Sequence, residues 1–136
     1  MSVPSGDLSL LDTPLAVELL ASRVPARLAY LWLDGTPRVV PIWFHWDGSN
    51  IVVCSPPKAP KLHALQQNSA VSLTVDSEEW PYKVLSIRGT ATVTMLADLA
   101  AEYAAAAERY LGPAEGQAWS AQLRGRPMGR VSIDPR

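Results

Sequence analysis

The segment from Pro37 to Lys61, PRVVPIWFHWDGSNIVVCSPPKAPK, constrains the fold more than any other part of the sequence. It combines two apolar stretches, a short polar turn between them, and a proline-rich loop that carries two of the three lysines of the chain. Proline has no N–H to donate, so within sheets it is confined to edge strands and bulges. Pro41, inside an apolar stretch, therefore predicts a strand at a sheet edge or a sheet that splits at this point.

Short turns connect the strands that we expect around this segment. The pattern predicts strands over residues 26–33, 38–46 and 51–54, separated by turn signals at residues 34–35 and 47–50. Parallel strands need long crossovers, which these turns exclude, so an antiparallel meander is predicted. The first strand is apolar on both faces. One face is therefore expected inside a barrel and the other under a helix or a second chain.

The remaining sequence predicts helices between further strands. Thr13 and Pro14 form a helix start, and other helices are expected from Pro60, from Ala97 and from Ala114. Alternation predicts strands over residues 71–75, 84–94 and 128–133. About six antiparallel strands with inserted helices predict a mainly β fold, a small Greek-key-like split β-barrel. We expect one domain over residues 1–136, with residues 1–12 as a loose N-terminal arm.

Charge and composition narrow the range of partners. The formal net charge of −1 argues against nucleic-acid or anionic-membrane binding. Cys54 is the one cysteine and there are two histidines, so neither a disulfide nor a metal centre is expected. No long apolar run and no signal-like leader is present in the sequence. We therefore expect a cytoplasmic protein that acts on a small molecule, not on nucleic acid or a membrane.

Lys58 and Lys61 flank Pro60 at the start of a predicted helix, after Ser55. Free N–H groups at a helix N-terminus, two ammonium groups and a hydroxyl together suit a phosphate group. The alternative is a pair of solvated lysines in a surface loop, which is the usual environment of lysine. Pro41 is also open to two interpretations. Either a planar ligand meets the backbone groups that are left unpaired there, or the strand is an ordinary edge or bulge.

Aromatic and basic residues later in the chain give weaker signals. Trp80 and Tyr82 lie in an expected loop, where they either cover a ligand ring, contact a partner chain or pack beneath the loop. Arg88 lies on a strand face of serines and threonines and either reaches a ligand or partner, or is simply exposed. Neither histidine has an acid and a nucleophile in its sequence context, so no Ser-His-Asp triad is predicted.

Three stretches, in this order and spacing, resemble the pyridoxamine 5′-phosphate oxidase-like family of FMN- and deazaflavin-binding split barrels. They are ARLAYLWLDGTPRVVPIWFHWDG, IVVCSPPKAPKLHALQQNSAVSLTVD and VLSIRGTATV. The resemblance covers roughly residues 14–93, and the last expected strand also fits. It implies a homodimer with the cofactor at the dimer interface.

The resemblance also implies roles for particular positions. It places an isoalloxazine ring along four consecutive residues, Val40, Pro41, Ile42 and Trp43. It assigns the cofactor phosphate to Ser55, Lys58 and Lys61. Contacts from the twofold-related chain are expected from Trp80, Tyr82 or Arg88.

The function implied is that of an oxidoreductase that uses FMN or the deazaflavin coenzyme F-420. The cofactor transfers hydride or electrons to an unidentified small molecule, and this chemistry requires no acid or base from the protein. The alternative is a non-catalytic protein that binds a flavin, a deazaflavin or a haem-like ligand. The loop PPKAPK has fewer arginines than the same loop in many relatives, so weaker or differently arranged contacts to the phosphate are expected. The sequence ends at Arg136, soon after the last strand, so pyridoxamine phosphate oxidation itself is not expected.

Overall fold

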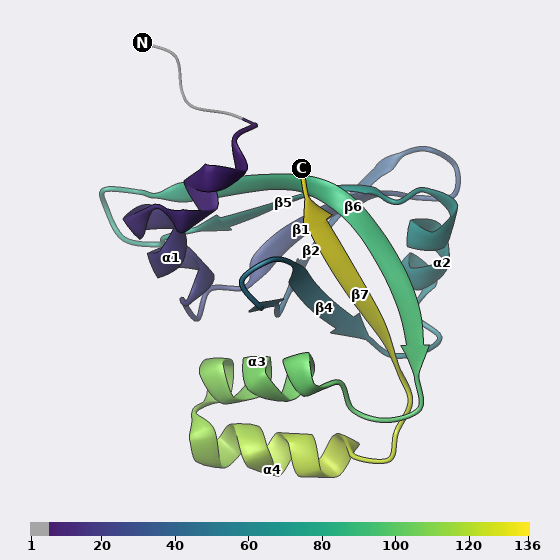
Figure 1. Cartoon of the computed structure of the whole chain (residues 1–136). Helices are drawn as coiled ribbons and strands as arrows, with labels where there is room; N and C mark the ends of the chain where they lie inside the picture. Colours follow the sequence, from purple (N-terminus) through teal and green to yellow (C-terminus); the bar gives the residue numbers. More distant parts are fainter. Residues whose placement is uncertain (1–5) are drawn as a thin grey trace.

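Alternating apolar residues build a curled antiparallel sheet, which forms most of the molecule (Figure 1). The computed structural model describes residues 6–136. Within these residues the strands are β1 (Ala26–Leu31), β2 (Pro37–Ile42), β3 (His45–Trp46), β4 (Ile51–Ser55), β5 (Ala70–Asp76), β6 (Val84–Leu96) and β7 (Met128–Pro135). Their order across the sheet is β2-β1-β5-β6-β7-β4-β3. The predicted split barrel with inserted helices is confirmed, with seven strands instead of about six.

The two edge strands of this sheet, β2 and β3, are neighbours in the sequence. Only Trp43 and Phe44 lie between them, so the sheet must curl until its two edges approach each other. We call these two residues the link. Phe44 is fully buried in the core of the barrel, and its burial anchors the link between the two edges.

The predicted strand over residues 38–46 is wrong as one continuous strand, and so is the three-stranded meander. β2 pairs with β1, β3 pairs with β4, and the other neighbour of β4 is β7. The pattern does not reveal the break because Trp43 and Phe44 are as strand-like as their neighbours. Pro41 lies opposite Arg27 in the edge strand β2, which confirms that this proline marks a sheet edge.

Three of the four α-helices that the structure describes begin close to their expected starts. α1 (Pro14–Leu20), α2 (Pro60–Gln67) and α4 (Pro113–Leu123) start with proline, whereas α3 (Ala101–Leu111) begins later than the expected Ala97. The Thr13 hydroxyl accepts a 3.3 Å hydrogen bond from the Ala16 N–H, as predicted for a helix cap. Part of the expected loose arm is instead the 3-10 helix η1 (Leu8–Asp12), and residues 1–5 lie outside the described residues.

α2 closes one end of the barrel by burying one face. Leu62, Ala64 and Leu65 join the core cluster with side chains from the strands. A Cβ atom at Gly129 of β7 would lie only 2.3 Å from Leu62 Cδ1, so α2 reaches this depth because residue 129 has no side chain. The start of α2 is thereby held next to the end of β4.

α3 and α4 form a helical hairpin that packs on β3 and β4 (Figure 1). On β4, Ile51 and Val53 belong to the core cluster, whereas the alternate residues Val52 and Cys54 point to the face that α3 covers. The two helices approach closely at Gly116, where a Cβ atom would lie 2.5 Å from the Glu108 Cα. The hairpin places the side chains of α3 beside the link.

Candidate functional site

Two adjoining pockets lie where the link, the end of β4 and the α3–α4 hairpin meet. The first, the link pocket, has a volume of about 390 Å³ and is lined by Pro25, Pro41, Ile42, Trp43, Cys54 and Tyr103. The second, the hairpin pocket, has a volume of about 340 Å³ and is lined by Cys54, Ser55, Pro56, Pro57, Tyr103, Trp119, Leu123, Arg126, Pro127 and Met128. Because both pockets include Cys54 and Tyr103, they form one groove.

Aromatic rings build the wall of the link pocket. Trp43 stacks on Tyr110 of α3, with 5.0 Å between ring centroids and 9° between planes. It is also 5.9 Å from Tyr103, at an angle of 32°. The Tyr110 hydroxyl donates to the Val24 carbonyl at 3.2 Å, and burial raises the pKa of Tyr110, so this donor stays protonated. These contacts hold the Trp43 ring in a fixed orientation.

Arg109 of α3 holds the backbone of the link. Its Nη2 donates to the Phe44 carbonyl at 2.6 Å, and its Nε donates to the Ser22 carbonyl at 2.9 Å. The guanidinium carbon also lies 4.8 Å from the centroid of the Phe44 ring and 4.7 Å from that of Tyr110. The arginine thus satisfies carbonyl groups at the place where strand pairing is interrupted. The position of the link therefore depends on α3.

Cys54 lies where the two pockets join. Burial raises the pKa of its thiol to about 12, so the thiol stays protonated near neutral pH and is a poor nucleophile. Opposite it on β7, Arg130 forms an ion pair with Glu102 of α3 at 2.8 Å. The hydrogen bond from Arg130 lowers the pKa of the Glu102 carboxyl. Glu102 and Arg130 are paired with each other, so neither is free to exchange a proton with a ligand.

Ser55, Lys58 and Lys61 form a second feature, which we call the lysine corner. Ser55 is 5% exposed, and its buried Oγ has no hydrogen-bond partner among the described residues. Lys61 is the second residue of α2 and is half-buried, and this burial lowers its pKa. Within residues 6–136 neither this lysine nor the exposed Lys58 has an ion-pair partner. The cap residue of α2, Ala59, has no side chain that binds the free N–H groups.

The structure brings together most of the residues predicted to contact a ring. Pro41, Ile42 and Trp43 line the link pocket. Val40 does not line it. Ser55 lines the adjoining hairpin pocket, and the lysine corner begins there.

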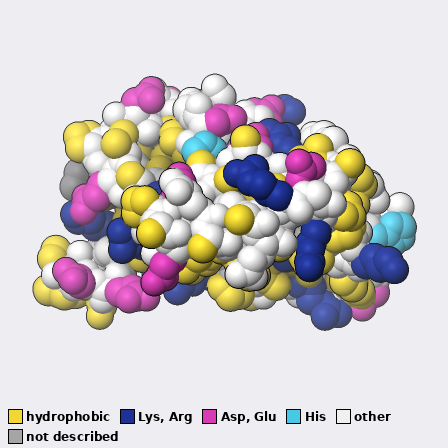
Figure 2. Space-filling model, turned by 90° about the horizontal axis from the view of Figure 1, so that it is seen from below, with side chains coloured by type: hydrophobic (Ala, Val, Ile, Leu, Met, Phe, Trp, Pro, Cys, Tyr) yellow, Lys and Arg dark blue, Asp and Glu magenta, His cyan; other side chains and the backbone are white. Residues whose placement is uncertain are grey.

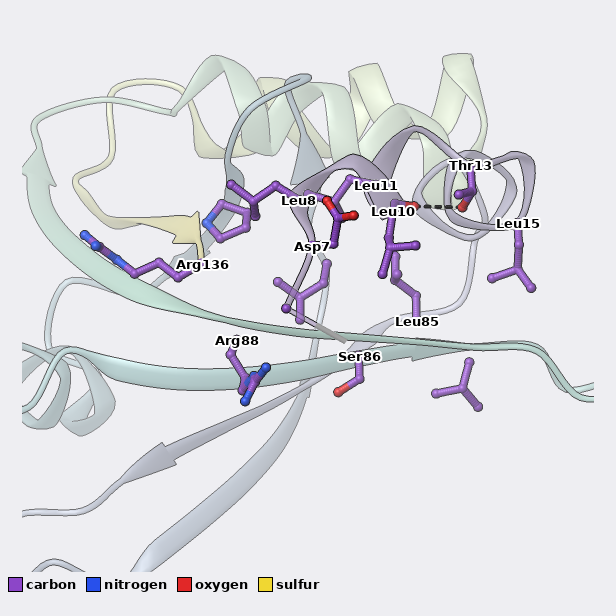
Figure 3. A pocket seen from close by; sticks show the side chains of 14 residues that line it. Asp7, Leu8, Leu10, Leu11, Thr13, Leu15, Leu85, Ser86, Arg88 and Arg136 are labelled. Atoms are coloured by element: carbon purple, nitrogen blue, oxygen red, sulfur yellow. Dashed lines mark hydrogen bonds between the residues drawn. The ribbon is translucent and has the colours of Figure 1, made fainter. Parts of the chain in front are cut away.

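Trp80, Tyr82 and Arg88 lie elsewhere in the same chain. The two aromatic residues are 81% and 65% exposed in the β5–β6 loop, which lies beside α1 and on the opposite side of the molecule from α2 (Figure 1). Arg88 lines a separate pocket of about 740 Å³. Figure 3 shows that pocket between the leucines of the N-terminal segment and the β6 residues that include Arg88. One chain therefore does not bring these three residues into the groove.

Several groove residues are not predicted from the sequence as site residues. Tyr103 and Tyr110 recur at helical spacing, which predicts the apolar face of a helix but not what that face covers. Arg109 and Trp119 carry no local signal of their own. Cys54 carries no site signal in the sequence beyond being the one cysteine, and the structure places it, partly exposed, between the two pockets.

A family model described as "Pyridoxamine 5'-phosphate oxidase" matches residues 13–133. The chain belongs to the pyridoxamine 5′-phosphate oxidase family. The matched range spans the link, both pockets and the lysine corner, and the resemblance seen in the sequence is confirmed. No curated protein matches the sequence.

Solved structures with the same fold come from several kinds of protein. An F-420 reductase is 26% identical, with a TM-score of 0.70, and the match covers 98% of this chain and 96% of that one. A conserved hypothetical protein from Mycobacterium tuberculosis is 19% identical, with a TM-score of 0.67 and coverage of 90% and 84%. The haem storage protein HutZ from Vibrio cholerae is also 19% identical, with a TM-score of 0.63 and coverage of 90% and 89%. The last two establish likeness of fold alone.

Three further observations concern the residues that the structure describes. Among the helices of residues 6–136, none is both long and apolar enough to cross a membrane. The same residues contain no group of three or more His, Cys, Asp or Glu side chains placed to hold a metal ion. On the face that carries the α3–α4 hairpin, basic and acidic side chains are interspersed with apolar ones (Figure 2).

Proposed function

We propose that this protein is a cytoplasmic, homodimeric oxidoreductase that binds FMN or coenzyme F-420 in the groove between the link and the lysine corner. Family membership and the 26% identity to an F-420 reductase support this assignment. The observation that carries it is the lysine corner. A half-buried lysine without a carboxylate partner and a buried hydroxyl without a hydrogen bond are costly unless a ligand supplies the missing partner.

The residues of the lysine corner fit a phosphate group. Lys58 and Lys61 supply positive charge, Ser55 supplies a hydroxyl, and the first turn of α2 supplies free N–H groups. This chemistry is common to FMN and to F-420. Pro41, Ile42 and Trp43 line the adjoining pocket, where they would orient a flat ring and exclude water from one side of it.

When bound, either cofactor accepts and releases hydride at its ring. The protein's part is to hold the ring in place. Trp43 is fixed by Tyr110 and Tyr103, and Arg109 fixes the backbone that follows. The Cys54 thiol remains protonated, and Glu102 remains paired with Arg130, so neither is assigned an acid–base role.

The proposed homodimer explains where Trp80 and Tyr82 would act. In one chain they lie far from α2, so they reach a cofactor only if it is bound to a second copy. Exposed apolar residues support such an association. Val39 of β2 and Leu33 after β1 are 65% and 52% exposed. Analytical ultracentrifugation of wild type and Val39→Glu tests this, and a monomeric wild type contradicts it.

The decisive experiment is titration of the purified protein with FMN and with F-420, followed by absorbance and fluorescence. We expect one of them to bind at micromolar concentration. The double variant Lys58→Ala/Lys61→Ala is expected to bind ~2–4 kcal/mol more weakly, because charge-assisted hydrogen bonds to the phosphate are lost.

An exposed arginine outside the groove provides the control. Arg124 lines neither the link pocket nor the hairpin pocket, so Arg124→Ala is expected to leave cofactor affinity unchanged. Unchanged affinity in the double variant would place the phosphate elsewhere. Failure of the wild type to bind either cofactor would refute the proposed function. Binding without reoxidation of the reduced cofactor by any acceptor would instead favour a non-catalytic binding protein.

A further inference from the structure

The hairpin pocket has an aromatic wall that contains Trp119 of α4 and Tyr103 of α3. The indole Nε1–H donates to the Tyr103 hydroxyl at 3.0 Å, which fixes the two rings relative to each other. The Trp119 ring nevertheless remains 38% exposed. A tryptophan with its N–H satisfied and its ring open to a pocket is suited to contact another flat apolar ring.

Trp119 takes part both in the packing of the two helices and in the lining of the pocket. α4 approaches α3 closely at Gly116, and the Trp119 indole N–H adds a hydrogen bond to Tyr103 of α3. Trp119 also lines the pocket, so part of its ring is available to a ligand beside the helix–helix contact.

The charge of the pocket selects a ligand with a negative group. Arg126 is the only charged residue among the described residues that line it, and within residues 6–136 it has no ion-pair partner. The neighbouring Cys54 stays a neutral thiol. The other lining residues are mainly prolines and apolar side chains, which favour a ring over a polar sugar.

We propose that the hairpin pocket binds the substrate, and that this substrate is a planar aromatic molecule with an anionic group. The ring lies against Trp119 and Tyr103, and the anionic group lies on Arg126. Because Cys54 and Tyr103 line both pockets, a molecule here lies next to the occupant of the link pocket. Hydride transfer between a cofactor and a substrate requires that the two molecules lie next to each other in this way. That this ligand is a substrate rests on the proposed function, whereas binding of an aromatic anion in the hairpin pocket does not depend on it.

The test uses the cofactor-free full chain and two probes of the same shape, 2-naphthoate and the neutral 2-naphthamide. Affinities are measured by isothermal titration calorimetry, and in proteins that keep Trp119 the site is located by the NMR signal of its indole N–H, assigned with Trp119→Phe. We expect 2-naphthoate to shift this signal. Trp119→Ala is expected to weaken both probes about tenfold, and Trp119→Phe to retain most of the affinity. Arg126→Gln is expected to weaken only the naphthoate, by roughly tenfold.

Arg124→Gln is the matched control, since Arg124 is two residues away and does not line the pocket. It is expected to bind both probes as wild type does, and circular dichroism establishes that each variant is folded. The proposal is overturned if the indole signal does not move at millimolar naphthoate, or if Arg126→Gln binds naphthoate as tightly as wild type.

Titration of FMN in the presence of 2-naphthoate separates the two proposals. We expect both to bind together. Mutual displacement would assign the hairpin pocket to the cofactor and overturn the substrate site. A wild type that binds neither FMN nor F-420, but binds naphthoate with the expected variant pattern, would refute the proposed function and support the aromatic-anion site.

Discussion

The link lines one pocket of the groove, Ser55 of the lysine corner lines the other, and the two features are built in opposite ways. At the link, aromatic rings stack on one another, and Arg109 donates to the Phe44 carbonyl. At the lysine corner, the Ser55 hydroxyl has no partner among the described residues, and Lys61 is half-buried without a carboxylate. Satisfied groups stabilise the fold, whereas unsatisfied buried groups cost stability until a ligand meets them. The comparison shows that the link stabilises the fold, and it supports the binding role that we propose for the lysine corner.

The largest effect is expected at the link itself, from Phe44→Ala. Phe44 is fully buried where the two sheet edges meet, so the change leaves a cavity and should lower the free energy of unfolding by roughly 3–5 kcal/mol. Urea denaturation measures this. Met95→Ala, at an exposed position of β6, is the control and should change stability by less than about 0.5 kcal/mol. Equal effects of the two changes would show that burial of Phe44 in the link does not stabilise the fold.

A smaller loss is expected from Arg109→Met, which keeps much of the side-chain length but removes the donors. The carbonyls of Ser22 and Phe44 lose a charged partner, and we expect a loss of about 2–3 kcal/mol in unfolding free energy. Arg23→Met, an exposed arginine near the end of α1, serves as the control. If Arg109→Met is as stable as this control, the link does not depend on α3.

The smallest effect on stability is expected at the lysine corner, from Lys61→Met. Burial lowers the pKa of Lys61 in the folded state, so the unfolded chain binds this proton more tightly. Wild-type stability should therefore rise with pH between the lowered folded pKa and the ordinary lysine value of 10.5.

Lys61→Met should lack that rise and be at least as stable as wild type at neutral pH. Urea titrations from pH 8 to 10.5 on both proteins provide the measurement. A variant clearly less stable than wild type at pH 7 would show that Lys61 stabilises the fold. The lysine corner would then not differ from the link in this respect.

The sequence predicts those parts of the molecule that local rules determine. Proline and threonine at positions 13–14 predict the start of α1, alternation predicts β5 and β6, and Pro41 predicts a sheet edge. The break at Trp43 and Phe44 is not predictable in this way. It arises because the two edges of the sheet must be joined, which depends on the pairing of strands far apart in the chain.

The candidate site follows the same division. The lysine corner is visible in the sequence because Ser55, Lys58 and Lys61 are close together in it, and because proline predicts the helix start between the two lysines. The aromatic walls are not visible, since Tyr103 and Trp119 reach the groove only when the α3–α4 hairpin folds onto β4. Val40 is predicted beside the ring because it neighbours Pro41, but it does not line the link pocket.

The position of β7 has a consequence for the order in which the protein assembles. This strand lies between β6 and β4, yet it follows both of them and the whole α3–α4 hairpin in the chain. During synthesis β6 and β4 therefore present unpaired edges to solvent until residues 128–135 emerge from the ribosome. Such edges are templates for pairing with other chains. The nascent protein is thus most vulnerable to aggregation just before the strand that completes its sheet becomes available.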